Sequence, residues 1–543
     1  MWRFWRWTSP ISLLFLCACQ AQEFSNSQSN NPFTTSGNNS NSENPGDKDI
    51  GDWTALTASV DTRIVYVSSS TGDDLNDGLT KESAKRTIAN ARLLIRSGYP
   101  DWLLLKRGDQ WEEIFGHPDS GRSASEPFVL SSYGEGARPI LHSLVDSIFA
   151  QIGERHFITV KGIHFSGVGR PASQQTSGVI WEGTGSHLLV EDCKFEFLTM
   201  GITIDSHGDT NNIKIRRNIF SNFYGTLVRP LAIYAVRTDS ILIEDNFFNE
   251  TGWENSQSPS PHTNGIAVFF YDANNFVIRK NIFSRHVGPA IRLQESGIVE
   301  DNLIFKSFGG ITMAAASVTA RANIILDATP YDPGFPFVFG IDVDRYAGGV
   351  APLGPVRVDG NIIKGKNTSI QHSAAIRVLS NLSSSATTTT VTKNTVYDWQ
   401  DTELFLQSSN WYDTVDVSEN TFYEPGSNPN LYMIAMELST VNQSLMHFSG
   451  NRYFSSNPAS KWFLENYVDR SWAQWVADSG ELNSSNQAIA FKNPGRDMNS
   501  YAQTVGLSDE GDLIEKLKTL EQGHWPVKFS AGSINSYIRD GFN

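Results

Sequence analysis

The chain has 543 residues, 39% of them hydrophobic, and a formal net charge of −15. This is the composition of a folded protein, and the negative charge argues against nucleic acid or anionic lipid as a nonspecific partner. An acidic polysaccharide is not excluded, because local basic patches can oppose the global sign.

The first residues predict an export signal. Two arginines precede the apolar segment 11–18, which is too short to span a membrane. Its end, "LCAC", resembles the bacterial lipobox, in which a small residue precedes the lipidated cysteine, and Cys19 fits that role. The alternative is an ordinary signal cleaved after Ala21. We expect residues 1–19 to be a lipoprotein signal peptide, and by resemblance Gln20 favours the bacterial outer membrane or cell surface.

Residues 20–52 predict a flexible tether, since Ser, Asn and Gly dominate and no apolar period is present. Only Cys193 remains after the signal, so no intrachain disulfide can brace the body. Lipid, tether and body together predict a monomer held at a membrane through its N-terminal anchor only.

The body repeats one short unit, apolar-x-x-Asn-x-apolar, as in "IRKNIFSR" at 278–285. Cys193 and Ile163 occupy the same slot in the two units before the first asparagine. The asparagines recur every 21 to 38 residues, at Asn218, Asn246, Asn281, Asn302, Asn323, Asn361, Asn394, Asn420 and Asn451.

Each unit consists of short alternating apolar runs broken by Gly, Asn, Asp and Ser, which predicts strands rather than helices. A period of this length indicates a solenoid in which every coil buries its apolar side on the next. At the bend between two strands the Asn is expected to adopt a left-handed conformation and to bond the Asn of the neighbouring coil. The sequence therefore predicts an all-β fold, a right-handed parallel β-helix.

Over residues 64–455 these units resemble the pectate-lyase-like superfamily of parallel β-helix proteins. The resemblance extends to the entry segment 64–95, which looks like the family's first strand, polar loop and N-terminal capping helix. The apolar face of that helix, suited to cover the open end of the solenoid, is formed by Ala84, Ile88, Ala91 and Ile95. We accordingly assign residues 53–455 to the β-helix.

Residues 456–543 lose the repeat, and segments 471–480 and 508–523 predict short helices, the second with Ser508 as its N-cap. We expect this region to be a small helical C-terminal cap on the other end of the solenoid. The alternative is a separate small binding module.

The candidate site lies on the strands that open with Gly or Ala and an inward aliphatic, such as "AIRLQ" and "GIDVD". Alternation turns Asp205 outward, together with a second set that consists of Arg292, Thr312, Asp342 and Arg377. Across stacked coils, this second set is expected to form one line about 14 Å long. This line could bind an acidic sugar, or it could be a ladder of charges that pair across coils. Asp342 and Asp344 could instead hold calcium.

His262, His286, Lys306 and His372 precede the same strands and are expected to line one edge of the sheet, where a neutral His or Lys can abstract a proton. Solvated surface residues are the plainer interpretation. The inserted loops 249–262 and 327–339 carry Trp253 and Tyr331, which are suited to stack on sugars or to cover the solenoid.

The resemblance implies a polysaccharide lyase that cleaves an acidic, uronate-containing glycan by β-elimination. Arg292 and Arg377, or a calcium ion on Asp342 and Asp344, would neutralise the sugar carboxylate. His286, His262 or Lys306 would be the base. Arg377, Trp253, Tyr331, His372 and Asp205 would bind substrate. The alternatives are an epimerase, a glycoside hydrolase, and a non-catalytic glycan-binding protein or adhesin on the same scaffold.

Overall fold

The computed structural model describes residues 48–144, 146–255, 258–259, 265–314, 317–329, 331, 338–344, 354–365, 373–379, 387–408, 414–426, 431–438, 443–456 and 461–543. All of them belong to the unit Asn44–Asn543. In the part of the chain so described, no helix is long and apolar enough to cross a membrane.

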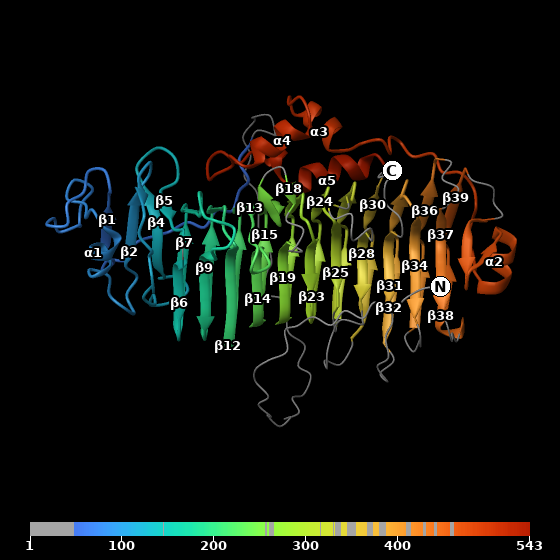
Figure 1. Ribbon diagram of the computed structural model, residues 1–543, viewed down its shortest axis with the longest axis horizontal. Helices are drawn as coiled ribbons and strands as arrows, with labels where there is room; N and C mark the ends of the chain where they lie inside the picture. Colours follow the sequence, from blue (N-terminus) through green and yellow to red (C-terminus); the bar gives the residue numbers. More distant parts are fainter. Residues whose placement is uncertain are drawn as a thin grey trace, which may run out of the picture. The chain divides into compact units, whose positions relative to one another are not determined.

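The chain winds into a parallel β-helix (Figure 1). Each full coil contributes one strand to each of three parallel sheets, two of which are joined through β12 (Met200–Arg216). Along the chain, a strand of sheet 1 leads through the Asn position to sheet 2, and then through a corner to sheet 3. Strand β12 is long enough to belong to sheets 3 and 1 in turn.

Sheet 1 contains the end of β12 and β1 (Ile64–Val67), β2 (Trp102–Lys106), β4 (Phe128–Tyr133), β7 (Arg155–Lys161), β10 (Gly185–Glu191), β15 (Ile241–Glu244), β20 (Phe276–Arg279), β23 (Ser296–Glu300), β26 (Ser317–Arg321), β29 (Val356–Asp359), β32 (Thr388–Thr392), β35 (Thr414–Ser418) and β38 (Met446–Ser449). Sheet 2 contains β3 (Gln110–Trp111), β5 (Ile140–His142), β8 (His164–Ser166), β11 (Lys194–Glu196), β13 (Ile219–Phe223), β16 (Phe247–Thr251), β21 (Ile282–Ser284), β24 (Leu303–Phe305), β27 (Ile324–Leu326), β30 (Ile362–Lys364), β33 (Thr395–Tyr397), β36 (Thr421–Glu424) and β39 (Arg452–Ser455).

Sheet 3 contains the start of β12 and β6 (Asp146–Ile152), β9 (Thr176–Gly183), β14 (Leu231–Asp239), β19 (Ile266–Asn274), β22 (Pro289–Leu293), β25 (Gly309–Met313), β28 (Phe339–Asp344), β31 (Ala374–Leu379), β34 (Thr402–Ser408), β37 (Tyr432–Leu438) and β40 (Phe463–Glu465). Antiparallel pairs are formed by β40 with β41 (Val468–Arg470) and by β17 (Trp253–Asn255) with β18 (Ser258–Pro259).

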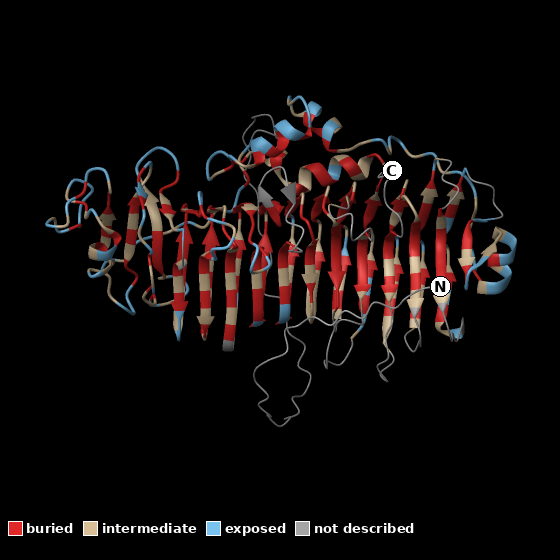
Figure 2. Ribbon diagram, in the orientation of Figure 1, coloured by how far each residue is buried: buried red, intermediate tan, exposed pale blue. Residues whose placement is uncertain are grey.

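The interior of the solenoid is a continuous apolar core, which Figure 2 shows as buried segments running along the stacked strands. On sheet 2 the inward position is a stack of phenylalanine rings with centroids 4.7 to 4.9 Å apart, formed by Phe165, Phe195, Phe220, Phe248 and Phe283. This separation is the spacing of hydrogen-bonded strands, so identical side chains in successive coils come into register.

The asparagine ladder is present as predicted. Each Asn from Asn218 to Asn420 donates its Nδ2 and backbone N–H to the Oδ1 of the Asn in the next coil; for Asn281 and Asn302 both distances are 3.0 Å. The expected left-handed conformation was wrong for the Asn itself. The residue just before it has the positive φ instead, as at Lys280 (54°) and Asp301 (53°). The Asn can then point into the ladder while its neighbour makes the bend.

The strands of sheet 3 open with Gly or Ala because the next coil approaches closely there. A Cβ added at Gly310 would lie 2.2 Å from the carbonyl oxygen of Gly340, and one added at Gly340 would lie 2.5 Å from that of Ala375. These contacts are shorter than atoms tolerate, so the corner between sheets 2 and 3 requires a small residue at these coils.

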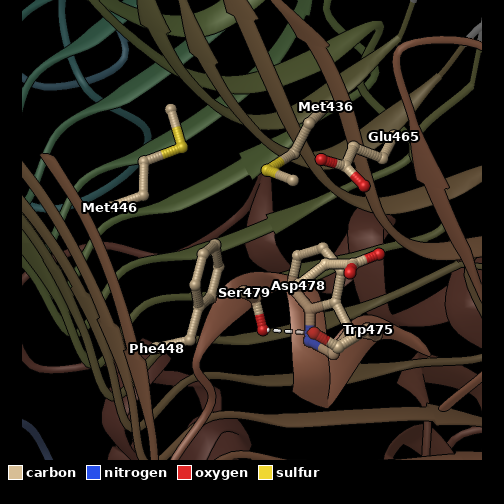
Figure 3. A pocket seen from close by; sticks show the side chains of 7 residues that line it. All are labelled: Met436, Met446, Phe448, Glu465, Trp475, Asp478 and Ser479. Atoms are coloured by element: carbon tan, nitrogen blue, oxygen red, sulfur yellow. Dashed lines mark hydrogen bonds between the residues drawn. The ribbon is translucent and has the colours of Figure 1, made fainter. Parts of the chain in front are cut away.

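Both ends of the solenoid are covered by helices. At the N-terminal end α1 (Ile88–Arg92) buries Ile88 and Ala91 on the core, as predicted. At the other end α2 (Trp472–Ser479) is N-capped by Ser471, and the Trp475 ring stacks on Phe463 with centroids 4.7 Å apart. A small cavity of about 10 Å³ lies beneath α2, and Figure 3 shows the side chains that line it. Among them, the Ser479 hydroxyl donates to the carbonyl oxygen of Trp475. This packing confirms a helical cap at the C-terminal end.

The rest of the C-terminal region does not cap an end, contrary to expectation. Helices α3 (Met498–Thr504), α4 (Glu510–Leu517) and α5 (Ala531–Asp540) run back along the side of the solenoid (Figure 1). They bury the outward apolar residues of sheet 2, including Phe247 and Leu303, in a second core. The N-cap of α4 is Asp509, not Ser508.

Residues 48–54 belong to the folded body, although residues 20–52 were expected to be a tether. Ile50 is buried in the second core, and the Asp49 carboxylate accepts from Trp525 N–H (2.8 Å), Gly523 N–H (3.2 Å) and Trp53 Nε1–H (2.9 Å). We call residues 48–59, which continue along sheet 1, the N-terminal strap. Residues 1–47, with Cys19, lie outside the described part of the chain.

Candidate functional site on sheet 3

The outward face of sheet 3 has the predicted register. Arg292 pairs with Thr312, Thr312 with Asp342, and Asp342 with Arg377 across consecutive strands. The same row continues in the other direction through Phe269, Tyr234 and Thr203. The charged line inferred from alternation is therefore confirmed, and it adjoins an aromatic stretch.

Asp342 and Arg377 form a closed ion pair. Arg377 Nε and Nη2 lie 2.7 and 2.9 Å from the two carboxylate oxygens of Asp342, and Asp342 is only 5% exposed. Burial alone would lower the pKa of Arg377, but the charge and hydrogen bond of Asp342, with the charge of Asp344, raise it. The Asp342–Arg377 half of the charged line therefore matches the interpretation as a ladder of charges that pair across coils.

The same geometry does not fit calcium. A guanidinium occupies both oxygens of Asp342 and feels the charge of Asp344, whereas calcium needs six to eight free oxygen ligands. Among the described residues, no group of three or more His, Cys, Asp or Glu side chains could hold a metal ion.

Arg292 differs from Arg377 because no described carboxylate lies within ion-pair distance of it. Its Nε atom is buried without a hydrogen-bond partner among the described residues, and its guanidinium carbon lies 6.0 Å from the centre of the Phe269 ring. Arg229, in the turn before β14, is exposed as a whole residue. Even so, desolvation of its guanidinium and, next, the charge of Arg292 lower its pKa. Arg229 is therefore near enough for the charge of Arg292 to act on it, and no described carboxylate pairs with either arginine.

Aromatic side chains lie beside this arginine pair. Tyr234 and Phe269, half-buried neighbours on β14 and β19, have ring centroids 5.5 Å apart. Tyr271, two residues after Phe269 on β19, is 51% exposed. We call Arg229, Tyr234, Phe269, Tyr271 and Arg292 the arginine–aromatic site. It combines flat rings for stacking with guanidinium groups for an anion.

Of this site, sequence reasoning proposed only Arg292; alternation also turns Phe269 outward, whereas Arg229, Tyr234 and Tyr271 were missed. Tyr234 and Tyr271 could have been found by extending the alternation to "LAIYAV" and to the end of "GIAVFFY". Arg229 stands in a turn without alternation, so its proximity to Arg292 follows only from the fold.

His286 does not line an accessible edge, so its prediction as the base is wrong. The side chain is fully buried, packs edge-on against Phe283 with centroids 6.1 Å apart, and has no hydrogen bond of normal geometry at either ring nitrogen in the described structure. Burial lowers its pKa to about 3. The corner residue turns inward here, whereas an edge position had been expected.

Lys306 is also removed from sheet 3. Its Nζ lies 2.8 Å from the Glu510 carboxylate on α4, because the C-terminal helices pack over sheet 2 at this corner. The Tyr331 hydroxyl donates to the Lys306 carbonyl oxygen. An ammonium that is ion-paired with a carboxylate is a poor candidate for a base.

Trp253 and Tyr331 do not form a sugar platform. Trp253 is 6% exposed, and its Nε1–H donates to the Arg285 carbonyl oxygen at 2.7 Å while the Arg285 guanidinium lies over the ring at 4.7 Å. Tyr331 packs edge-on against Trp253, and burial raises the pKa of its phenol. Both rings therefore fix their loops on the solenoid, which was the alternative interpretation.

Asp205 forms an ion pair with Arg237 on the next coil, so its carboxylate is neutralised on the sheet 3 face. His262 and His372 lie outside the described residues, and their proposed roles stay predictions.

Residues 149–325 match the family model described as "Right handed beta helix region". Together with the three parallel sheets, this match defines the class: the chain is a right-handed parallel β-helix protein. No curated protein sequence matches it.

Three solved structures illustrate the similarity. A PL6 family alginate lyase has 13% identity and a TM-score of 0.48, with 75% of this chain and 53% of that chain covered. A mannuronic acid specific polysaccharide family 6 lyase from human gut microbiota has 12% identity and a TM-score of 0.43, over 78% and 91%. A GH136 lacto-N-biosidase from Eubacterium ramulus has 12% identity and a TM-score of 0.41, over 70% and 68%.

Proposed function

We propose that the chain binds an acidic polysaccharide on the outer face of sheet 3, at the arginine–aromatic site. The observation that carries this proposal is Arg292, whose buried Nε atom has no hydrogen-bond partner among the described residues and whose charge acts on the nearby Arg229. Like charges repel, so the pair becomes favourable when an anion lies between the guanidinium groups.

The chemistry of the site favours a uronate over a neutral sugar. A guanidinium binds a carboxylate through two parallel hydrogen bonds, and the exposed Tyr271 ring can stack on a sugar face next to it. The parallel strands repeat every 4.8 Å or so, which is close to the rise of a sugar residue in an extended chain. A polymer can therefore run along the solenoid axis with successive units over successive coils.

The finer proposal is cleavage by β-elimination. Arg229 and Arg292 would neutralise the carboxylate and so acidify the proton on the adjacent carbon. Of the three bases predicted from the sequence, His286 is buried and Lys306 is ion-paired, which leaves His262. An epimerase would use the same groups and is distinguished by its product.

A glycoside hydrolase built on Asp342 and Asp205 is disfavoured by distance. The two residues lie on strands separated by five register steps, from β12 through β14, β19, β22 and β25 to β28. Five steps correspond to about 24 Å, whereas the two carboxylates of a glycosidase lie roughly 5 to 9.5 Å apart. Both are also held by arginines.

The test is incubation of the chain with pectin, alginate and a sulfated glycan, with and without calcium, followed by ultraviolet absorbance and a reducing-end assay. Rising absorbance that is lost in His262→Gln, while binding persists, supports the lyase. New reducing ends without absorbance would identify a hydrolase instead. Binding without either product leaves a glycan-binding surface protein, and no binding at all overturns the proposal.

We also propose that the protein is a monomer anchored to a bacterial outer membrane through lipidated Cys19. The motif "LCAC" and the Ser/Asn-rich segment before residue 48 support this proposal. Membrane fractionation of the wild type and Cys19→Ser tests it: release of the variant into the soluble fraction is expected, and equal retention would contradict the anchor.

A further inference from the structure

We infer that the outer face of sheet 1 carries a second binding site for an oligosaccharide, separate from the arginine–aromatic site. A hollow of about 300 Å³ lies on the neighbouring strands β26, β29 and β32. Its lining consists of Thr319, Arg321, Arg357, Asp359, Thr390 and Thr392. The volume is at the lower end of the range for ligand sites, about 300 to 1,000 Å³.

The hollow continues a row of alternating charges along sheet 1. In register, the residue at the end of each strand is Lys161, Glu191, Arg216, Glu244, Arg279, Glu300, Arg321, Asp359 and then Thr392. Neighbours within the row are paired, for example Arg279 with Glu244 at 2.7 Å and Arg321 with Glu300 at 2.6 Å. At the hollow, the residue that ends each strand changes from a charged side chain, Asp359, to the hydroxyl-bearing Thr392.

Another segment of the chain already lies on the first part of this row. The N-terminal strap accepts a hydrogen bond from Arg216 at Asp52 O (2.8 Å), and at Thr54 it donates to Glu191 (3.0 Å) and accepts from Lys161 (2.6 Å). The row can therefore hold an extended polymer parallel to the solenoid axis through its charged groups. The hollow offers comparable groups farther along the same face.

The groups lining the hollow match a saccharide better than a peptide. All six side chains are polar, and the strands are paired on both sides, so neither an apolar pocket nor a free sheet edge is offered to a peptide. Arg357 is exposed and has no partner among the described side chains, while Asp359 accepts from the Thr392 hydroxyl at 2.9 Å. Threonine hydroxyls and Asp359 can bond sugar hydroxyls, and Arg357 can bind a carboxylate on the ligand.

The number of binding sites on the full-length chain can be counted by isothermal titration calorimetry with alginate oligomers. The choice of an acidic oligosaccharide as the probe rests on the proposed function. Two equivalents are expected for the wild type. Arg357→Ala should weaken one of them about tenfold or more, the loss of one charge-assisted hydrogen bond. Thr390→Val, nearly equal in volume, should weaken the same equivalent. Arg452→Ala, an exposed arginine on β39, is the matched control and should bind like the wild type.

The outcomes separate the two proposals. One equivalent that is lost in Arg292→Ala and unchanged in Arg357→Ala would overturn the sheet 1 site and leave the proposed function standing. One equivalent that is lost only in Arg357→Ala would support the sheet 1 site and overturn the proposed function on sheet 3. Displacement of the oligomer by a synthetic peptide of residues 20–47 would also overturn the inference, because the hollow would then belong to the chain's own N-terminal segment.

Discussion

At the scale of single residues, burial shifts the pKa values of two ionisable side chains toward their neutral forms, and the two act on stability with opposite dependence on pH. Burial lowers the pKa of His286 to about 3 and raises the pKa of Glu403 well above its usual value, with a further contribution from the charge of Glu424. Neither carboxylate oxygen of Glu403 has a hydrogen-bond partner of normal geometry in the described structure.

His286 should make the fold sensitive to acid. Its folded pKa is below the unfolded value of 6.5, so its neutral form stabilises the fold fully above pH 6.5, and this stability is lost as pH falls. The free energy of unfolding should decrease by about 1.4 kcal/mol per pH unit from this group alone. Urea titrations at pH 7.5 and 5.5 should show a smaller decrease for His286→Leu than for the wild type. His524→Gln, at an exposed histidine, should change nothing, and an equal decrease in all three would contradict the prediction.

Glu403 should have the opposite effect. Its folded pKa is above the unfolded value, so the stability it contributes is complete at low pH and is lost as pH rises toward the folded pKa. Glu403→Gln should therefore unfold at higher urea concentration than the wild type at pH 8, and the two should converge near pH 4. Glu515→Gln, at an exposed glutamate, is the control. A variant less stable than the wild type at pH 8 would show that the carboxylate has a partner.

At the scale of elements, the asparagine ladder was readable from the sequence because a one-residue motif repeats in every coil. The directions of the side chains at the corners between sheets could not be predicted in this way. His286 occupies a turn where alternation stops, so its direction could not be inferred. The surroundings of Trp253 and Lys306 are formed by Tyr331 and by Glu510 on α4, respectively. These are long-range contacts, which no local sequence pattern predicts. Glu403 occupies the same register position that Ala375 has in the preceding coil, and nothing in the described structure explains why a carboxylate stands there.

The ladder predicts a large cost for a single substitution. In Asn302→Ala the backbone N–H and the Nδ2 of Asn281 lose their acceptor, and Asn323 loses a donor to its Oδ1. We expect a loss of about 2 to 4 kcal/mol in the free energy of unfolding, measured by urea titration, since buried polar groups are left unpaired. Asn211→Ala, outside the ladder on β12, should cost less than about 1 kcal/mol. Equal costs would contradict a structural role for the ladder.

At the scale of the whole molecule, the N-terminal strap and the C-terminal helices stabilise each other on the side of the solenoid. Asp192 accepts from Arg138 (2.6 Å) and from Gln522 N–H (2.9 Å), and Arg107 pairs with Glu521 (2.5 Å). Together with Asp49 these contacts fasten the segment between α4 and α5 to the first coils. A chain shortened to residues 53–543 would lose part of this fastening.

Asp49→Ala should loosen that segment without unfolding the solenoid. Three donors, Trp53 Nε1–H and the N–H groups of Gly523 and Trp525, would lose their acceptor. Limited proteolysis should cut faster between residues 518 and 530, while the thermal midpoint of the body changes little. Glu112→Ala, an exposed carboxylate, is the control. Unchanged cleavage would show that the Asp49 carboxylate does not hold the segment between α4 and α5 in place.

On sheet 3, Arg229 and Arg292 are proposed to bind the carboxylate of an acidic glycan. The most direct test is the dissociation constant of an alginate oligomer for Arg357→Ala, in which sheet 3 is the remaining site, with and without Arg229→Ala and Arg292→Ala. We predict that removing both arginines weakens binding about 100-fold or more, and that added salt then has less effect, because two charge-assisted hydrogen-bonding groups are lost. An unchanged dissociation constant and salt dependence would contradict the claim.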